Sequence, residues 1–286
     1  MTFQFINAQR QQFPVVRLCA ALDVSESGYY AWQQRPVSAR EQENRQLLVR
    51  MRAIHAESRR TYGSPRVHAE LRAQGLCCNR KRVARLMREH GLRAKMSKRY
   101  RVTTMSKHGL PVAPNHLRRA FWAEKPNEKW VSDITYVPTT EGWLYLSAVM
   151  DLYSRAIVGW SMSGSLSSTL AQDALQMAIA RRQPDAGLLH HSDRGVQYAS
   201  ADYQTLLSDQ QMIPSMSGRG NCYDNAAMES FFGTLKSEQV NDQHYHTRTE
   251  ARQDIFSYIE VFYNRQRRHS TLGYLSPAEF ERQTMS

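Results

Sequence analysis

The hydrophobic pattern of this 286-residue chain changes near Trp130. Before that point apolar residues recur at the spacing of one helix face, whereas residues 130–138, WVSDITYVP, alternate as a strand does. With this strand counted first, strands and amphipathic helices follow in the order β-β-β-α-β-α-β-α, ending in a helix within residues 220–238. This order predicts an α/β fold with a mixed sheet covered by helices, preceded by an all-helical first half.

Charge is distributed unevenly along the chain. The net charge is +12, but residues 1–125 hold 25 Lys and Arg against 8 Asp and Glu, whereas residues 126–286 hold 13 against 18. A basic first half joined to a mildly acidic second half indicates that the first half binds a polyanion and that the second half has another role. The alternative is that the charge only keeps the protein in solution.

Residues 62–95 contain two short predicted helices around a glycine turn. Ser64 is the expected N-cap of the first helix, with Pro65 at its first position, and Gly75 breaks the chain before Asn79 caps the second helix. This plan is typical of a helix-turn-helix that binds DNA, and an ordinary helical hairpin with a solvated basic face is the alternative. The predicted DNA-binding residues are the basic side chains of the second helix, Arg80, Lys81, Arg82, Arg85 and Arg88.

A weaker copy of this pattern lies in residues 13–36. An apolar helix is expected from about Val15 to Leu22, followed by Ser25 as the N-cap of a second helix that carries an aromatic cluster. The pattern fits either a second helix-turn-helix or a helical module that packs against its neighbour.

Composition divides the chain into five predicted segments. The fragment between the basic helices and Trp130 mixes basic residues with Pro and Gly and shows no steady period, which indicates a linker. The segments are an N-terminal helical region (1–58), a helix-turn-helix module (59–96), a basic linker (97–125), a catalytic core (126–240) and a C-terminal helical extension (241–286).

Targeting signals and disulfide patterns are not evident in the sequence. The chain has no apolar run of the length that spans a membrane, and its first residues lack the pattern of a signal peptide, so a cytoplasmic protein is expected. The four cysteines, Cys19, Cys77, Cys78 and Cys222, include no CxxC spacing, and neither a disulfide framework nor a zinc knuckle is expected from them.

Three acidic residues of the second half occupy positions that need an explanation. Asp133 lies in the middle of the first predicted strand, where an unpaired buried carboxylate would cost about 2–5 kcal/mol. Asp193 comes at the end of a buried strand, where α/β sheets collect functional residues. Glu229 lies at the edge of the apolar stripe of the helix expected within residues 220–238. Taken singly, Asp133 could pair with an arginine, Asp193 could begin a turn, and Glu229 could be an ordinary surface charge.

Together the three carboxylates suggest one explanation. Side chains from two strands and a helix can converge at one edge of a sheet, and hard anionic oxygens are the ligands that Mg²⁺ prefers. Two such ions can activate a water or a sugar hydroxyl and stabilise the leaving oxygen in an in-line attack on phosphorus. The pattern therefore predicts phosphodiester chemistry on DNA, with the carboxylates holding the metal.

The chain resembles the integrase core shared by retroviral integrases and bacterial insertion-sequence transposases in three acidic motifs: WVSDITYV (130–137), HSDRGVQY (191–198) and DNAAMESFFGTLKSE (224–238). Between Asp193 and Glu229 lie 35 residues, the spacing typical of that Asp-Asp-Glu superfamily, and Lys236 stands where the family carries a basic residue. Nearly the whole chain is similar to the second-reading-frame protein, OrfB, of the family called insertion sequence three, including the tail of residues 262–280. The resemblance implies a ribonuclease H-like fold for the core.

The resemblance also implies roles for individual residues. Asp133, Asp193 and Glu229 would be the catalytic residues and the ligands of two Mg²⁺ ions, which Mn²⁺ could replace. Lys236 would contact the DNA end close to the cleaved phosphate, and Asn225 would orient Glu229 or the substrate.

Other polar residues are expected to serve the structure. Asp151, at a strand end, and Asp224, as an N-cap before the helix of Glu229, fit structural roles. Retroviral integrases carry a His-His-Cys-Cys zinc module, but His55 and His68 of this chain have no CxxC partner, so no zinc site is expected.

The function that the resemblance implies is a DNA transposase, which nicks an element end to free a 3′-hydroxyl and uses that hydroxyl to attack a second phosphodiester. Its expected partners are element-end and target DNA, further copies of the chain on that DNA, and an OrfA protein, separate or fused as OrfAB; no membrane partner is expected. A DNA-binding regulator of transposition that is inactive without OrfA is the alternative. A ribonuclease H or structure-specific nuclease on the same fold is a third hypothesis.

Overall fold

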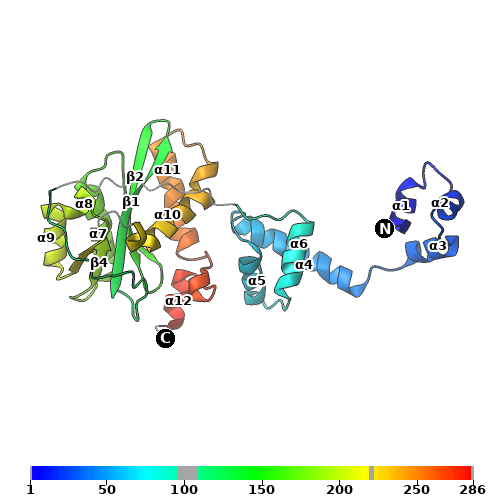
Figure 1. Cartoon of the computed structure of the whole chain (residues 1–286), viewed down its shortest axis with the longest axis horizontal. Helices are drawn as coiled ribbons and strands as arrows, with labels where there is room; N and C mark the ends of the chain where they lie inside the picture. The colour runs from blue at the N-terminus through cyan, green and yellow to red at the C-terminus, as the bar shows by residue number, and fades with distance from the viewer. Residues whose placement is uncertain (1, 96–108, 219–221, 285–286) are drawn as a thin grey trace. The chain divides into compact units, whose positions relative to one another are not determined.

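The computed structural model describes residues 2–95, 109–218 and 222–284 and divides the chain into two compact units, Met1–Ala53 and Ile54–Ser286 (Figure 1). The first unit is built from helices, and the second contains a five-stranded sheet. In the ranges described, none of the helices combines the length and the apolar character needed to cross a membrane.

The N-terminal unit consists of three short helices and the first part of a longer one. Their bounds are Thr2–Gln9 (α1), Val15–Ala21 (α2), Glu26–Gln34 (α3) and Ala39–Glu57 (α4). The predicted cap at Ser25 is confirmed, because its Oγ accepts a 3.1 Å hydrogen bond from the backbone N–H of Gly28 at the start of α3. Ile6, Cys19 and Tyr29 form the small core of this unit. That α2 and α3 bind DNA stays a prediction.

Two short helices joined by a glycine turn follow α4, as the sequence predicts. They span Ser64–Ala73 (α5) and Arg80–Glu89 (α6). The Asn79 side chain caps α6 by accepting a 2.8 Å hydrogen bond from the backbone N–H of Lys81. The predicted cap at Ser64 is wrong: Ser64 has already entered the helix, and Gly63, which is extended, is the N-cap. Gly75 adopts a φ of +78°, which a residue without Cβ reaches at little cost.

The second unit contains a mixed sheet with the strand order β3-β2-β1-β4-β5. The strands span Lys129–Thr139 (β1), Gly142–Asp151 (β2), Ile157–Ser163 (β3), Leu189–Ser192 (β4) and Ile213–Met216 (β5). The first three strands pair antiparallel, whereas β4 pairs parallel with β1 and β5 parallel with β4. Parallel neighbours need helical crossovers, which explains why strands and helices alternate only after β3. The predicted element order is confirmed, with the short helix α8 as an addition.

Helices cover both faces of the sheet. One face packs against Ser168–Arg182 (α7), Val196–Ala199 (α8) and Ala201–Asp209 (α9). On the other side of β1 and β2 lie α10 and α11 (Figure 1). The elements from η1 to the C-terminus span Cys222–Asn225 (η1), Ala226–Glu238 (α10), Val240–Asp242 (η2), Arg248–Phe256 (α11), the π-helical Ser257–Tyr263 (η3), Ser270–Leu272 (η4) and Pro277–Thr284 (α12).

Part of the predicted linker packs on the core. Residues 97–108 of that segment lie outside the described ranges, while the part from residue 109 onward runs along β5 without forming a helix or a strand. Leu117 is 1% exposed, and the Ser215 Oγ accepts hydrogen bonds from the backbone N–H groups of His116 and Leu117 at 2.9 and 3.2 Å. This stretch is therefore held by the sheet of the second unit.

The close approach of α7 to β3 generates a stability prediction. A Cβ on Gly159 would lie 2.2 Å from the Ala174 carbonyl oxygen and 2.7 Å from the Ala178 Cβ. Gly159→Ala should lower the free energy of unfolding by about 1–3 kcal/mol, the usual cost of overpacking, measured by urea denaturation. In Gly233→Ala the new Cβ meets nothing within 4 Å, so this control should gain about 0.5–1 kcal/mol. A Gly159→Ala protein as stable as the parent would contradict this packing.

Candidate active site

The parallel pairing of β1 with β4 brings Asp133 and Asp193 near each other. The paired residues end at Val131 and His191; Asp133 and Asp193 each follow two residues later, with Asp193 just beyond the end of β4. Residues in register on neighbouring parallel strands point to the same side of the sheet. Two carboxylates that are distant in the sequence therefore share one edge of the sheet.

The electrostatics of Asp133 show that the other two acids act on it. Burial and then the charge of Asp193 raise the pKa of Asp133 well above its ordinary value, and Glu229 adds to the rise. The backbone N–H of Ile134, 2.8 Å from Asp133 Oδ1, and the ammonium of Lys236 oppose it. Like charges at close range favour a proton on one carboxylate unless a cation is present.

Asp193 and Glu229 are positioned by different means. Asp193 Oδ1 accepts a 2.8 Å hydrogen bond from the backbone N–H of Gly195, which fixes the carboxylate in the turn after β4. Glu229 lies in the first turn of α10, where the helix dipole favours a negative charge, and burial raises its pKa. The turn after β4 therefore positions Asp193, and the first turn of α10 positions Glu229.

The apolar stripe of α10 orients this helix on the sheet. Its predicted members are buried as expected: Met228, Phe231, Phe232 and Leu235. Glu229 and Lys236, which are about two turns apart, lie together at the edge of that stripe. Lys236 Nζ is 4.7 Å from the ring centroid of Tyr136; burial lowers the pKa of Lys236 and the Asp133 charge raises it. The stripe therefore turns a carboxylate and an ammonium toward the edge that carries Asp133.

Asn225 connects α10 to β1. It is the N-cap residue of α10 but makes no side-chain cap; its Nδ2 instead donates a 3.0 Å hydrogen bond to the carbonyl oxygen of Ser132, the residue before Asp133. Asn225 is 5% exposed, and its Oδ1 has no hydrogen-bond partner among the described residues. The structure thus shows Asn225 anchoring the start of the helix that carries Glu229.

The three acids are not gathered closely enough to form a metal site in the described residues. Across residues 2–95, 109–218 and 222–284, no group of three or more His, Cys, Asp or Glu side chains is gathered so as to hold a metal ion. Asp133 lies beside Asp193, and Glu229 is near enough to act on the pKa of Asp133. Their assignment as joint metal ligands therefore stays a prediction.

The spare acids carry structural hydrogen bonds. Asp151 accepts from the backbone N–H groups of Asn127 and Tyr153, both at 2.9 Å, and burial raises its pKa to about 6. Asp224 is not the N-cap of α10, a position that Asn225 takes because the chain first forms the 3₁₀ turn η1. Asp224 accepts instead from Arg119 Nε at 2.9 Å.

Tyr198 is a neighbour of the acids that sequence reasoning missed. It lies in α8, is fully buried, and its pKa is raised well above the ordinary value by burial, by Tyr203 and by the charges of Asp133 and Asp193. Its position five residues after Asp193, within HSDRGVQY, was the only available signal. The phenol ring belongs to the apolar core cluster between the sheet and α7.

The basic residues of α6 lie apart from its buried face. Val83, Leu86 and Met87 point inward, as predicted. Arg80, Lys81 and Arg88 are exposed, while Arg82 and Arg85 are half-buried, and Arg85 forms an ion pair of 3.1 Å with Glu89. The helix therefore presents a largely basic surface.

Family models match both halves of the chain. Residues 123–222 and 229–285 match two models described as Integrase core domain, and residues 41–100 match one described as HTH-like domain. With the sheet order above, these matches define a ribonuclease H-like integrase core preceded by a helix-turn-helix DNA-binding domain, within the integrase and transposase superfamily of polynucleotidyl transferases.

Relatives narrow this class. The chain is 46% identical over 288 residues, 100% of both sequences, to Transposase InsF for insertion sequence IS3A of Escherichia coli (strain K12). It is 47% identical over 263 residues, 92% of this chain and 97% of the relative, to the insertion element IS600 uncharacterized 31 kDa protein of Shigella sonnei. The chain belongs to the IS3 family of insertion-sequence transposases.

A solved structure also aligns with part of the chain. The HTLV-2 integrase catalytic core domain in complex with magnesium (trimeric form) covers 55% of this chain and 98% of its own, with 16% sequence identity and a TM-score of 0.44.

The charge crowding at Asp133 predicts an unusual gain of stability on substitution. A raised carboxyl pKa means that the folded state binds the proton more tightly than the unfolded state, so the free energy of unfolding falls as pH rises above the unfolded pKa of about 3.9. Asp133→Asn removes this penalty. In metal-free buffer the variant should be more stable than the parent by on the order of 1–2 kcal/mol at pH 8, and the gain should vanish near pH 4.

Urea denaturation across this pH range measures the difference. Asp173→Asn, at an exposed position of α7, is the matched control and should show no pH-dependent gain. An Asp133→Asn protein that is less stable than the parent at pH 8 would contradict the crowding of charge at this edge.

Proposed function

We propose that the chain cleaves phosphodiester bonds at the ends of an insertion sequence and transfers the resulting 3′-hydroxyl ends to target DNA. The observation that carries the proposal is that the charges of Asp193, Glu229 and Lys236 all act on the buried Asp133, in a chain of the transposase family. The three acids would be its catalytic residues. Cutting and joining two element ends at one place also favours several copies of the chain on the DNA, as predicted.

The donor set at the sheet edge suits Mg²⁺, with Mn²⁺ as a substitute. Asp133, Asp193 and Glu229 offer only hard carboxylate oxygens, and the raised pKa of Asp133 reflects negative charge that a cation would offset. Two bound ions would activate the attacking hydroxyl or water and stabilise the leaving oxygen.

The remaining residues would position the acids and the DNA. The backbone N–H groups of Ile134 and Gly195 orient one carboxylate each, and Asn225 keeps the start of α10 against β1. The Lys236 ammonium lies near the Asp133 charge and would contact a DNA phosphate at the same edge. Asn225 would affect the DNA indirectly, because it fixes the start of α10 and thereby the position of Glu229.

The basic surface of α6 would bind DNA through its phosphates. Arg80, Lys81, Arg82, Arg85 and Arg88 would lie along a groove of the duplex, with the neighbouring helix α5 supporting α6 from behind. This binding would concentrate the chain on the substrate of the catalytic core.

Removing a carboxylate should abolish cleavage. The purified chain and its fusion to the upstream OrfA would be incubated with labelled element-end DNA and Mg²⁺, and nicked product would be measured on denaturing gels. Asp133→Asn, Asp193→Asn and Glu229→Gln should each lower the nicking rate by at least about 100-fold, a barrier increase of roughly 2.7 kcal/mol. Asp173→Asn should nick like the parent.

The outcomes separate the hypotheses. Undiminished nicking by Asp193→Asn would rule out the assigned acids. If the fusion nicks and the isolated chain only binds DNA, OrfA is a required partner. If neither nicks under Mg²⁺ or Mn²⁺, the DNA-binding regulator is the better account, and nicking without strand joining would favour a nuclease.

Neutralising α6 should weaken DNA binding in a salt-dependent way. Lys81→Gln and Arg88→Gln should each reduce the slope of log affinity against log salt concentration by about 1, because one phosphate contact is lost. Fluorescence anisotropy with duplex DNA measures the slopes. Arg252→Gln, at an exposed position of α11, is the charge-matched control. Equal slopes for all these proteins would exclude α6 from the DNA interface.

A further inference from the structure

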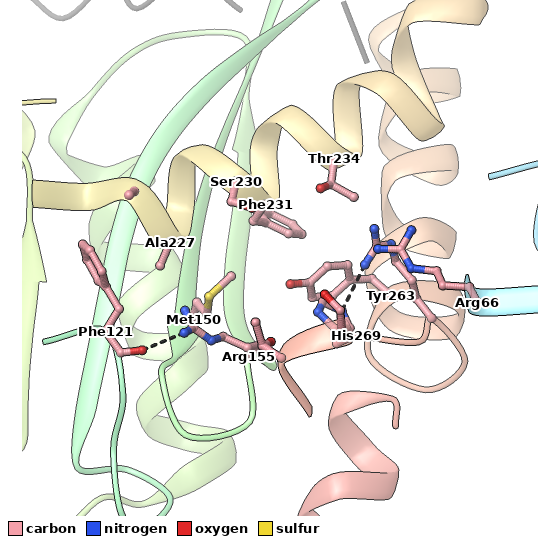
Figure 2. A pocket seen from close by; sticks show the side chains of 14 residues that line it. Arg66, Phe121, Met150, Arg155, Ala227, Ser230, Phe231, Thr234, Tyr263 and His269 are labelled. Carbon is pink, nitrogen blue, oxygen red and sulfur yellow. Dashed lines mark hydrogen bonds between the residues drawn. The ribbon is translucent and has the colours of Figure 1, made fainter. Parts of the chain in front are cut away.

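A pocket of about 310 Å³ lies along α10 (Figure 2). Ala227, Ser230 and Thr234 form its α10 side, and at about 100° per residue they lie roughly 100–160° around the helix from Glu229. The proposed catalytic edge and this pocket therefore use opposite flanks of one helix.

Three arginines from separate parts of the chain line the pocket. Arg66 comes from α5, Arg155 from the turn between β2 and β3, and Arg267 from the segment after η3. Figure 2 shows Arg66 with Tyr263 and His269 at one end of the pocket and Arg155 with Phe121 at the other.

The positive charge of this cluster is only partly balanced. Glu238 accepts two hydrogen bonds from Arg267, at 2.7 and 2.8 Å, and lies 3.6 Å from Arg66. Arg155 donates a 2.6 Å hydrogen bond to the Phe121 carbonyl oxygen and has no ion-pair partner among the residues that the structure describes. Burial and the charges of the three arginines lower the pKa of His269 to about 2, so its imidazole is neutral. Three guanidinium groups thus face a single carboxylate.

Burial makes this excess charge costly. Arg267 is 4% exposed and the Arg66 side chain 25%. Burial lowers the pKa of Arg66 and of Arg155, and the neighbouring Arg267 lowers that of Arg66 further. A cationic group that is removed from water without a counter-ion destabilises the folded state, so a bound anion would stabilise this arrangement.

The backbone conformation of Arg155 is strained, which indicates that its side chain is required at this position. Its φ is +62°, in the left-handed region that costs a residue with a Cβ roughly 1–2 kcal/mol. A glycine or asparagine would relieve that strain, yet the turn carries an arginine whose guanidinium reaches the pocket. Strain of this kind clusters at ligand sites.

The other lining groups suit a phosphate. Hydroxyl groups of Ser230, Thr234 and Tyr263 can donate to anionic oxygens, and guanidinium forks match phosphate geometry. The first turn of α10 also borders the pocket, where its backbone adds partial positive charge. A volume about ten times the ~30 Å³ share of one water has room for a phosphate with its adjoining sugar.

We propose that this pocket binds a backbone phosphate of a DNA strand, apart from the carboxylate edge. The proposal rests on the proposed function, because that function supplies DNA as the ligand. A phosphate held between Arg66, Arg155 and Arg267 joins α5, the β2–β3 turn and the C-terminal segment. It also fixes the flank of α10 opposite Glu229, so that DNA bound here steadies the helix of the third acid.

Inorganic phosphate tests the pocket without DNA. Thermal unfolding of the full chain would be followed in phosphate and in chloride at equal ionic strength, comparing variants because phosphate stabilises folded proteins in general. Arg155→Gln should lose most of the phosphate-specific rise in Tm, whereas Arg155→Lys should keep part of it. Arg265→Gln, an exposed arginine two residues before Arg267 and outside the pocket, should keep the full rise. Circular dichroism checks that each variant is folded.

DNA binding tests the source of the phosphate. In salt titrations with duplex and single-stranded DNA, Arg155→Gln and Arg66→Gln should each reduce the slope of log affinity against log salt by about 1, and Arg265→Gln should not. If Arg155→Gln and Arg66→Gln have the same slope as the parent, the proposal is overturned. If inorganic phosphate nevertheless stabilises the protein in a way that depends on Arg155, the pocket binds free phosphate and not DNA. Neither readout uses cleavage, so a failure of the proposed catalytic function is seen separately in the nicking assay.

Discussion

The parallel pairing of β1 with β4 is the constraint on which the site depends. It brings the strand end that carries Asp193 next to Asp133, and burial together with the charge of Asp193 raises the pKa of Asp133. The fold opposes this cost with the Ile134 N–H group and the Lys236 ammonium but does not remove it. Natural sites often sacrifice stability for function in this way, and here the unbalanced charge is of the sign that a divalent cation would offset.

Helix α10 connects the acidic edge of the sheet to the rest of the domain. Its apolar stripe packs into the core, its start is tied to β1 through Asn225, and one flank presents Glu229 and Lys236. The opposite flank borders the arginine pocket, where Glu238 at the end of the same helix holds Arg267. A single helix thus has its position set from the sheet, from the core and from the C-terminal segment.

The sequence predicted what local periodicity and capping control. Strand alternation after Trp130 gave the element order, and Asn79 and Ser25 marked two helix starts correctly. Two other helix starts were predicted wrongly. Ser64 is already part of α5 and does not cap it. Asn225, not Asp224, is the N-cap of α10, because a 3₁₀ turn precedes the helix. The three pocket arginines could not be grouped from the sequence, because only tertiary packing brings α5, the β2–β3 turn and the C-terminal segment together.

The most direct test of the account is a carbon-13 NMR titration of the Asp133 carboxyl group in the metal-free protein. The account predicts a pKa well above the ordinary value of about 3.9, a fall toward that value in Asp193→Asn, and a fall in the parent when Mg²⁺ is added. An ordinary Asp133 pKa that neither Asp193→Asn nor Mg²⁺ changes would contradict the claim that the β1–β4 register creates a carboxylate pair poised for metal.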